Sequence, residues 1–308
     1  MRIAIVGTGA MGSVYAGLLG DAGNEVWAID AWQDHVDAIN ANGLRVEGAS
    51  GDRVARIRAT SDPAEVGVCD LVVVSTKAMH VDAASQAARP LVGPDTVVLP
   101  IQNGLGSAEV VARNMGEEQT ALGVVGGFGA SIVAPGHVHH NGWELLGLGE
   151  RGHPATDRIR RVAQVWEDAG FRVKVYDDVD LLVWTKLVCN VCFSGTCAIL
   201  DRTISEVMGD PDAWAVASAC ATEAYRAGRA AGIPFAFDDP VEHVRDFGSK
   251  IPNARPSMLL DLRAGRRCEV DVINGAIPRV SKQHGLEAPT NEVVVHLVKA
   301  REAIALGG

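Results

Sequence analysis

The first thirty residues constrain the fold more than any other part of the chain. An apolar run of strand length, residues 2–6, leads into a glycine-rich turn, and an apolar-periodic helix follows through Tyr15 and Leu18. Glycines in this context let the backbone approach a pyrophosphate at the start of the helix. Strand, turn and helix together predict a dinucleotide-binding site. Its residues are Gly7, Thr8, Gly9, Ala10, Met11 and Gly12.

The end of the second strand indicates which dinucleotide binds. Residues 25–29 form an apolar strand that ends in Asp30, at the distance where an acidic residue meets the adenosine ribose. A carboxylate accepts hydrogen bonds from both ribose hydroxyls but repels the 2′-phosphate of NADP, which normally pairs with an arginine. Ala31, Trp32 and Gln33 supply no positive charge. The segment therefore favours NAD(H), with NADP(H) as the alternative.

The pattern up to residue 177 predicts a doubly wound parallel sheet. The later strands are expected at residues 44–46, 55–59, 71–74, 96–101 and 172–176, with helices at 36–39, 81–88 and 156–169. Turn signals at Pro135-Gly136 and Asn141-Gly142 predict antiparallel strands added to this sheet over residues 121–148. Ligands bind at the carboxyl ends of such parallel strands. Lys77 and Asn103 follow two of them and are candidate site residues.

A polar stripe marks the helix that opens the second half of the chain. Lys186, Asn190 and Ser194 are spaced four residues apart in an otherwise apolar stretch, so they share one face of a helix. Such a helix should be buried with its polar stripe lining a cavity. Burial lowers the pKa of a lysine toward the range that is useful for proton transfer. The alternative is a lysine whose ammonium reaches solvent beside a core asparagine.

From residue 178 onward the pattern is helical throughout. Glycines and prolines separate the expected helices, which are 178–200, 211–231, 240–247, 256–264, 271–284 and 291–305. We therefore expect a dinucleotide-binding domain at residues 1–177 and an all-helical substrate and catalytic domain at residues 178–308. The fold class is α/β, with an N-terminal Rossmann-type doubly wound sheet followed by an all-helical C-terminal domain.

Two segments of the helical half offer further polar groups. Pro256 is expected at the first position of a helix, which leaves Ser257 in a first turn where it either binds a carboxylate or caps the helix. Glu269 lies between apolar residues after Gly265. An acid there is either a solvated surface charge or a partner for a buried Lys186.

Composition and charge exclude several classes of partner. A formal net charge of -10 argues against nucleic acid and against an anionic membrane surface. The first strand begins at residue 2 and leaves no room for a signal peptide. The apolar stretch 187–200 is interrupted by polar residues and is too short to span a bilayer. These features favour a cytoplasmic protein.

Neither the cysteines nor the histidines predict a metal site. The six cysteines lie mostly in apolar runs, as buried free thiols do. Cys189 and Cys192 have the spacing of a redox or zinc pair but lie in the middle of a helix without a second pair. His137, His139 and His140 are explained more simply by a strand that exposes a polar face.

The motifs, taken in order, resemble those of the ketopantoate reductase (2-dehydropantoate 2-reductase) family. They are Gly7 to Gly12, Ser75-Thr-Lys77, Gln102-Asn103-Gly104, Trp184-x-Lys186-x-x-x-Asn190, Pro256-Ser257-Met258, Glu269 and Asp271-x-Ile-Asn274-Gly275. The likeness covers nearly the whole chain. It implies a nicotinamide-dependent oxidoreductase that reduces 2-dehydropantoate, a small 2-oxo acid, to (R)-pantoate in pantothenate and coenzyme A biosynthesis.

The resemblance also implies a role for each matching residue. Lys186 would be the general acid that protonates the carbonyl oxygen. Glu269 would bind the substrate hydroxyl, help to position Lys186 and contact the cofactor. The remaining matches would be Asn190 and Ser257 for the substrate, Asn103 between substrate and cofactor, and Lys77 beside the cofactor.

Two positions depart from the better-known family members and support an alternative function. Ser194 stands where those members have a second substrate-binding asparagine, and Ala31, preceded by Asp30, stands where they have an arginine for the 2′-phosphate. The resemblance also extends to NAD-dependent D-2-hydroxyacid dehydrogenases that act on branched or aromatic 2-oxo acids, and both changes shift weight toward them, although 2-dehydropantoate reduction stays the first choice. A catalytically silent NAD sensor is a third hypothesis, but it has no use for Lys186 and Glu269. The apolar helical faces permit a homodimer.

Overall fold

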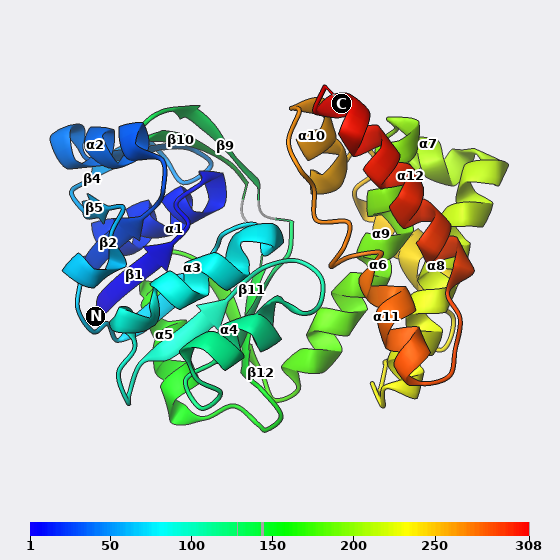
Figure 1. Cartoon of the computed structure of the whole chain (residues 1–308), viewed down its shortest axis with the longest axis horizontal. Helices are drawn as coiled ribbons and strands as arrows, with labels where there is room; N and C mark the ends of the chain where they lie inside the picture. The colour runs from blue at the N-terminus through cyan, green and yellow to red at the C-terminus, as the bar shows by residue number, and fades with distance from the viewer. Residues whose placement is uncertain (128, 143–144, 308) are drawn as a thin grey trace. The chain divides into compact units, whose positions relative to one another are not determined.

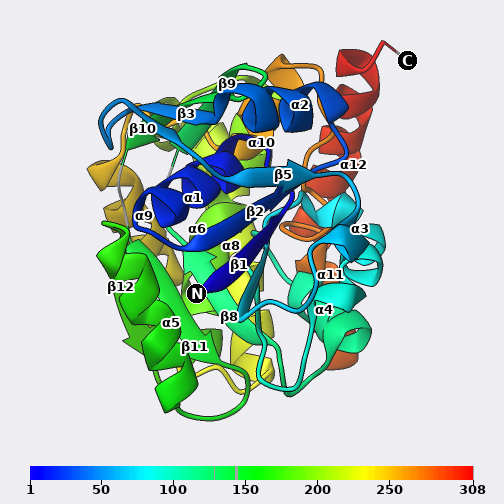
Figure 2. The ribbon, with the colours of Figure 1, turned by 90° about the vertical axis from the view of Figure 1, so that its left-hand side faces the viewer.

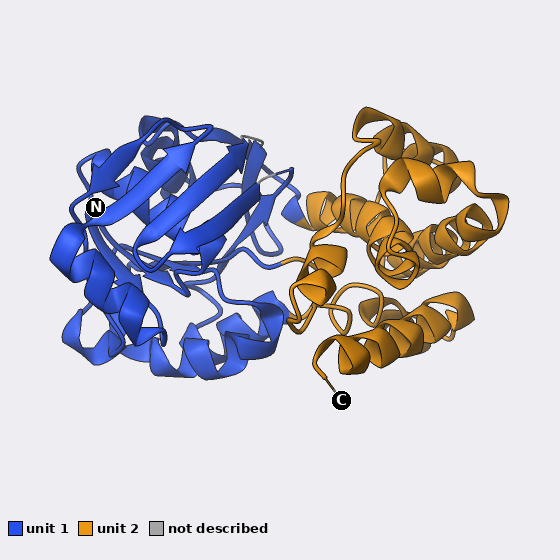
Figure 3. Cartoon of the chain, turned by 90° about the horizontal axis from the view of Figure 1, so that it is seen from above, with its two compact units in different colours: residues 1–102, 107–179 blue, residues 103–106, 180–308 orange. Residues whose placement is uncertain are grey.

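The chain divides into two compact units, coloured in Figure 3. The computed structural model describes residues 1–127, 129–142 and 145–307. Unit 1 comprises Met1–Gln102 and Ser107–Val179, and unit 2 comprises Asn103–Gly106 and Asp180–Gly308. The turn Asn103–Gly106, which we expected in the first domain, therefore groups with the helical unit.

The central sheet of unit 1 is parallel and confirms the predicted fold class. Its order is β5-β2-β1-β6-β7. The strands are β1 (Arg2–Val6), β2 (Glu25–Ile29), β5 (Arg58–Thr60), β6 (Leu71–Val74) and β7 (Val97–Pro100). Strand order reverses between β1 and β6, which is the point where ligands bind in such sheets. Val6 pairs with Ile29 and with Val74, so β1, β2 and β6 end at the same edge.

Helices cover both faces of this sheet because side chains alternate along each strand. Ile3 and Ile5 pack in one core cluster with α1 (Ala10–Asp21) and α5 (Asp157–Asp168). Ala4 and Val6 face the opposite cluster, with α3 (Val81–Ala87) and α4 (Ser107–Met115). Figure 2 shows α3 and α4 on one side of β1 and β2, and α1 and α5 on the other. Helix α4 was not predicted from the sequence.

The remaining strands form two further sheets, so the expectation that residues 121–148 add to the central sheet holds only where a single parallel bridge joins Val98 to Thr120, just before β8. One sheet has the order β4-β3-β10-β9, and the other has the order β12-β11-β8. Their strands are β3 (Leu44–Gly48), β4 (Arg53–Ala55), β8 (Ala121–Val125), β9 (Gly129–Ala134), β10 (His137–Gly142), β11 (Leu145–Glu150) and β12 (Arg172–Tyr176). The hairpin β9-β10 is antiparallel as predicted, but β10 also pairs in parallel with β3.

The strand predicted at residues 55–59 is in fact two strands. β4 ends at Ala55 and pairs with β3, whereas β5 begins at Arg58 and pairs with β2. Ile57, between them, packs against Gly20 of α1, where an added Cβ would lie 2.3 Å from its Cγ2 atom. Helix α2 (Gln33–Asn42) and three short 3-10 helices (Pro63–Glu65, Ala78–His80 and Arg89–Leu91) complete unit 1.

Unit 2 contains helices and turns throughout its described residues. The helices are α6 (Val179–Leu200), α7 (Ile204–Gly209), α8 (Pro211–Ala230), α9 (Pro240–Lys250), α10 (Ser257–Arg263), α11 (Ala276–Gln283) and α12 (Pro289–Ala305). Helices α8, α11 and α12 pack against one another (Figure 1). Leu187, Val191 and Phe193 of α6 are buried in the core of the unit. Helix α7 was not predicted.

Two boundaries in unit 2 differ from the sequence prediction. The helix predicted from Asp271 begins only at Ala276, and residues 271–275 form a turn. The carbonyl of Val272 accepts a hydrogen bond from Leu105 N–H, so it is used outside a helix. Pro256 is the N-cap of α10 rather than its first residue, which makes Ser257 the first helical residue.

Helix α6 is long and apolar enough to cross a membrane by length and composition alone. The apolar stretch 187–200, which is too short by itself to span a bilayer, belongs to a helix of 22 residues. Packing explains its composition, since 67% of its most apolar window is buried inside the structure. The helix is the central element of the unit 2 core.

Candidate active site

The glycine turn of unit 1 lies at the edge where the strand order reverses. Gly7 has a φ of +90°, and a Cβ added there would lie 2.5 Å from Thr76 Cγ2. A Cβ on Gly12 would lie 2.1 Å from the carbonyl oxygen of Gly7. The turn after β1 therefore packs against the residues after β6 so closely that only glycine fits at these two positions.

The start of α1 is free to bind an anion. Its N-cap is Gly9, no side chain caps it, and its first turn contains no acidic residue. The N–H groups and the positive end of the helix dipole therefore remain for a pyrophosphate. Thr8 is buried, whereas Ala10 and Met11 are partly exposed and pack on the core. The predicted turn residues form a cradle that fits a dinucleotide.

Asp30 lies after β2 with both carboxylate oxygens held. Oδ1 accepts a hydrogen bond from Trp32 N–H at 3.0 Å, and Thr8 Oγ1 donates to Oδ2 at 3.5 Å. Ala31, Trp32 and Gln33 are exposed, and the first turn of α2 adds a second acid, Asp34. The segment after β2 is therefore negatively charged where a 2′-phosphate would need a cation.

A buried histidine, which sequence reasoning missed, fixes this part of unit 1. Gly136 N–H donates to Nδ1 of His35 at 3.0 Å, so Nδ1 carries no proton and Nε2–H faces Ser13 Oγ at 3.1 Å. Ser13 Oγ donates in turn to the carbonyl of Thr8. Burial lowers the pKa of His35, in keeping with a neutral ring. The one signal for this site in the sequence was a histidine next to Val36, in a helix whose other residues are mostly polar or alanine.

Three of the predicted residues of unit 2 form one hydrogen-bonded group. Lys186 Nζ donates to Asn103 Oδ1 at 2.7 Å, and Asn103 Nδ2 donates to Glu269 Oε2 at 3.4 Å. Glu269 is only 6% exposed. Burial lowers the pKa of Lys186 to about 8, and the charge of Glu269 opposes that fall. The predicted partnership of Lys186 with Glu269 is therefore present, with Asn103 as the bridging residue.

The turn that carries Asn103 is locked to the segment that carries Glu269. Gly104 has a φ of +81°, and a Cβ there would lie 2.1 Å from the carbonyl oxygen of Val272. Leu105 N–H donates to the same oxygen at 2.8 Å. Arg279 of α11 donates to the carbonyl of Leu105 at 3.2 Å. These contacts explain why a turn that follows β7 groups with unit 2.

The other predicted residues lie on the expected elements. Asn190 and Ser194 continue the face of α6 that begins at Lys186, with Asn190 partly exposed and Ser194 buried. Ser257 is exposed at the start of α10. Lys77 is partly exposed and follows Thr76 beyond the end of β6 in unit 1.

The cysteines and histidines show no sign of metal binding in residues 1–127, 129–142 and 145–307. That part of the chain contains no group of three His, Cys, Asp or Glu residues arranged to hold a metal ion. His137 and His139 face Glu47 at 3.0 and 3.6 Å. The six cysteines are buried free thiols, and burial raises the pKa of Cys189 to about 12.

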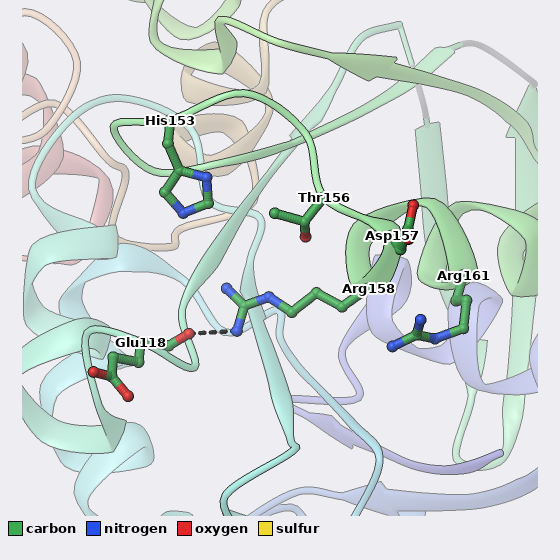
Figure 4. A pocket seen from close by; sticks show the side chains of 6 residues that line it. All are labelled: Glu118, His153, Thr156, Asp157, Arg158 and Arg161. Carbon is green, nitrogen blue, oxygen red and sulfur yellow. Dashed lines mark hydrogen bonds between the residues drawn. The ribbon is translucent and has the colours of Figure 1, made fainter.

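Two cavities are lined by residues other than these candidates. One, of about 570 Å³, lies at the start of α5, where Arg158 donates to the carbonyl of Glu118 (Figure 4). Arg158 also pairs with the buried Glu150 at 2.7 Å. The other, of about 690 Å³, is a mainly apolar groove lined by α6, α8 and α12.

Comparison with known proteins gave matches over nearly the whole chain. The family model for ketopantoate reductase PanE/ApbA matches residues 3–153, and the model for its C-terminal part matches residues 178–302. The 2-dehydropantoate 2-reductase of Archaeoglobus fulgidus is 31% identical over 303 residues, with 98% of each chain covered.

Solved structures agree with these sequence matches. A PanE/ApbA family ketopantoate reductase from Ralstonia eutropha JMP134 superposes with a TM-score of 0.90, at 31% identity and 99% coverage of both chains. A D-mandelate dehydrogenase in complex with NADH and anilino(oxo)acetate also has a TM-score of 0.90, at 28% identity and the same coverage.

Proposed function

Because the chain belongs to the ketopantoate reductase family, we propose that it reduces 2-dehydropantoate to (R)-pantoate, with NADH as reductant and Lys186 as general acid. As a family member it is a nicotinamide-dependent oxidoreductase. One observation carries the proposal: a half-buried ammonium, Lys186, donates to Asn103, which donates in turn to the buried carboxylate Glu269. A binding protein has no need of such an acid.

Each residue has a distinct task in this reaction. The bound nicotinamide supplies the hydride. Lys186 Nζ donates a hydrogen bond to the substrate carbonyl oxygen, stabilises the developing alkoxide and transfers a proton to it. The substrate gains one hydride and one proton, so its C=O becomes CH–OH. Asn103 fixes the direction of Nζ, and Glu269 accepts the hydrogen bond of the substrate hydroxyl.

The substrate carboxylate requires donors of its own. We assign Ser257 and Asn190 to this task, because a hydroxyl at the start of α10 and an amide on the Lys186 face of α6 can both donate to a carboxylate. Ser194 is one turn further along the same face and would border the side chain of the substrate. Its small size leaves room there.

The proposed activity is tested by the loss of nicotinamide absorbance when purified protein is mixed with 2-dehydropantoate. The assay is run with NADH and NADPH in parallel and repeated with branched and aromatic 2-oxo acids. Rapid oxidation of NADH with 2-dehydropantoate is the expected result. Absence of turnover with this substrate and either cofactor would exclude the proposal.

The rate of reduction should fall above pH 8. Lys186 must be protonated to act as an acid, and burial lowers its pKa from 10.5 to about 8. We expect kcat/KM for reduction to be flat at lower pH and to fall about tenfold per pH unit above pH 8, with the reverse trend for alcohol oxidation. A reduction profile that stays flat beyond pH 9 would contradict the assignment of Lys186.

Stability should respond to pH in the same range. Between pH 8 and 10.5 the unfolded chain holds a proton on Lys186 that the folded protein has released. The contribution of Lys186 to the free energy of unfolding therefore rises with pH across this window. Urea unfolding of the wild type and of a Lys186→Met variant at pH 7 and pH 9.5 isolates this contribution, which the variant lacks.

We propose NADH as the natural cofactor on electrostatic grounds. A 2′-phosphate near the ribose would meet the carboxylates of Asp30 and Asp34, and none of the intervening residues is a cation. The combined variant Asp30→Ala, Ala31→Arg should raise the NADPH to NADH ratio of kcat/KM by at least about tenfold, since one charge-assisted contact is worth that much. Asp37→Ala, which removes an exposed acid further along α2, is the matched control and should leave the ratio unchanged. An unchanged ratio in the double variant would show that Asp30 does not face the ribose.

A second candidate function is supported by one structural relative, a D-mandelate dehydrogenase, and by one residue, Ser194. The D-mandelate dehydrogenase structure contains NADH and anilino(oxo)acetate, and Ser194 is smaller than the asparagine that the better-known family members carry at this position. In that case the chain is an NAD-dependent D-2-hydroxyacid dehydrogenase with the same Lys186 chemistry. Turnover of aromatic or branched 2-oxo acids, with none of 2-dehydropantoate, would support this alternative.

A further inference from the structure

A series of buried polar side chains ends at the turn that carries Glu269. Asn274, which is 0% exposed, lies in this turn. Its Nδ2 donates to the carbonyl of Val191 on α6 and to Oδ1 of Asn291 on α12, both at 3.0 Å. Asn291 Nδ2 donates to Oε2 of Glu223 on α8 at 2.8 Å. Two amides and one carboxylate therefore connect three helices to the turn.

The carboxylate fixes the direction of every hydrogen bond in the series. Glu223 accepts from Thr290 N–H and Asn291 N–H, each at 2.9 Å, in the first turn of α12. It also accepts from the side chain of Asn291, so the NH₂ group of Asn291 is used and only its oxygen faces Asn274. Asn274 must then present its NH₂ group to Asn291 and to α6. Each amide has one orientation that satisfies its partners.

This series connects α6, which carries Lys186, to the turn that carries Glu269. Glu269 is in the same turn as Asn274, and Asn103 is mounted on that turn through Gly104 and Leu105. Lys186 is on α6, little more than one helical turn before Val191, which Asn274 contacts. Asn274 thus joins the support of the general acid to the support of its two partners.

The packing around Asn274 leaves little room for adjustment. A Cβ added to Gly195 of α6 would lie 2.3 Å from Val294 Cγ1 and 3.0 Å from Asn274 Oδ1. Loss of the Asn274 amide would leave the buried Asn291 oxygen without this donor and the Val191 carbonyl with only its intrahelical hydrogen bond, and buried polar groups are costly to leave unpaired. The turn would then shift to find other partners.

We propose that Asn274, held in place by Asn291 and Glu223, is a positioning residue for the reduction. It keeps Glu269 and Asn103 at their distances from Lys186. The proposal rests on the function proposed above, because it assigns Asn274 to the geometry of the proton donor. The proposal thereby gives Asn274, Asn291 and Glu223 a role in the reaction, although none of them contacts a reacting atom.

The test compares Asn274→Ser with a matched control, Val298→Ala. Serine is neutral and smaller, so it fits the site but cannot make both contacts. Val298 is buried in α12 about two helical turns after Asn291 and belongs to the same core, and its apolar side chain makes no hydrogen bond, so its truncation lowers stability through packing. We expect Asn274→Ser to lower kcat by about 10²-fold, the usual effect of a small misplacement of catalytic groups. The affinity for NADH should change far less than kcat, because the glycine turn belongs to unit 1.

A second measurement reports on Lys186 without any substrate. The ε-amines are labelled at low extent over a range of pH, and mass spectrometry compares Lys186 with the exposed Lys250. If Glu269 moves away, Lys186 loses a charge that raises its pKa, so Asn274→Ser should shift its titration to lower pH. Val298→Ala should shift the melting temperature and leave the titration unchanged.

The outcomes separate this inference from the proposed function. A wild type that reduces no 2-oxo acid overturns the function, whereas the Lys186 titration still tests the role of Asn274. If Asn274→Ser matches Val298→Ala in its titration, Asn274 is merely structural and the proposal is wrong. Should Asn274→Ser not fold, Glu223→Gln disturbs the same series from its far end and must shift the titration in the same direction. An unchanged Lys186 titration in that variant would equally overturn the proposal.

Discussion

Replacing Lys186 with methionine should lower kcat by about 10³-fold or more while NADH affinity stays within about twofold of the wild type. Methionine keeps the length and the apolar body of the side chain but cannot donate a proton or stabilise an alkoxide. The residue lies in unit 2, whereas the candidate cofactor cradle lies in unit 1. Steady-state rates with the best 2-oxo acid and fluorescence titration with NADH measure the two quantities separately.

The stability of this variant provides a further check. Methionine removes a charge whose burial is unfavourable, but it also leaves Asn103 Oδ1 without its donor and the buried Glu269 without its counter-charge, so the opposing effects should keep the melting temperature at pH 7 within about 4 °C of the wild type. Lys250→Met, at an exposed position at the end of α9, is the matched control and should leave kcat unchanged. If the Lys186→Met protein keeps most of its kcat, Lys186 is not the general acid.

Gly12→Ala should weaken NADH binding by about 10²-fold, since forcing a methyl group into close-packed structure commonly costs 1–3 kcal/mol. The new Cβ would lie 2.1 Å from the carbonyl oxygen of Gly7 and 2.8 Å from Ser75 Oγ. Both contacts are with parts of the predicted cradle, so relief of the clash must move the turn that would hold the pyrophosphate. Titration with NADH, followed by Trp fluorescence, measures the change.

Two other glycine substitutions serve as comparisons for Gly12→Ala. Gly209→Ala has no atom within 4 Å of the new Cβ and should change neither binding nor melting temperature. Gly9→Ala is equally open in the protein, yet it should weaken NADH binding because the pyrophosphate approaches the backbone there. Normal NADH binding by Gly12→Ala would place the cofactor somewhere other than the turn after β1.

The parts of the fold that were predicted correctly depend on local pattern. The strand, turn and helix over residues 2–21 lie in sequence order, and the continuous apolar runs of β1 and β6 predict strands that are covered on both faces. The pairing of β10 with β3 joins residues almost one hundred positions apart, and no local signal predicts it. The same reason accounts for the three sheets that replace the single one expected.

The candidate site shows the same division between local and distant information. The spacing of Lys186, Asn190 and Ser194 on one helix face is a local property and could be read directly. The bridge from Lys186 through Asn103 to Glu269 joins three distant segments, and only their fold brings them together. His35 was missed because a histidine in a short polar helix gives no sign that Ser13 and Gly136 surround it.

The turn Asn103–Gly106 also limits how such enzymes can be recombined. The polypeptide passes between the two units at residues 102–103, 106–107 and 179–180, rather than once. A helical half taken from residue 180 onward would lack the asparagine that holds its own lysine. A chimera that exchanges substrate specificity between relatives therefore has to transfer residues 103–106, from the middle of the nucleotide-binding half, together with the helical half. The segment to be exchanged is not continuous in the sequence.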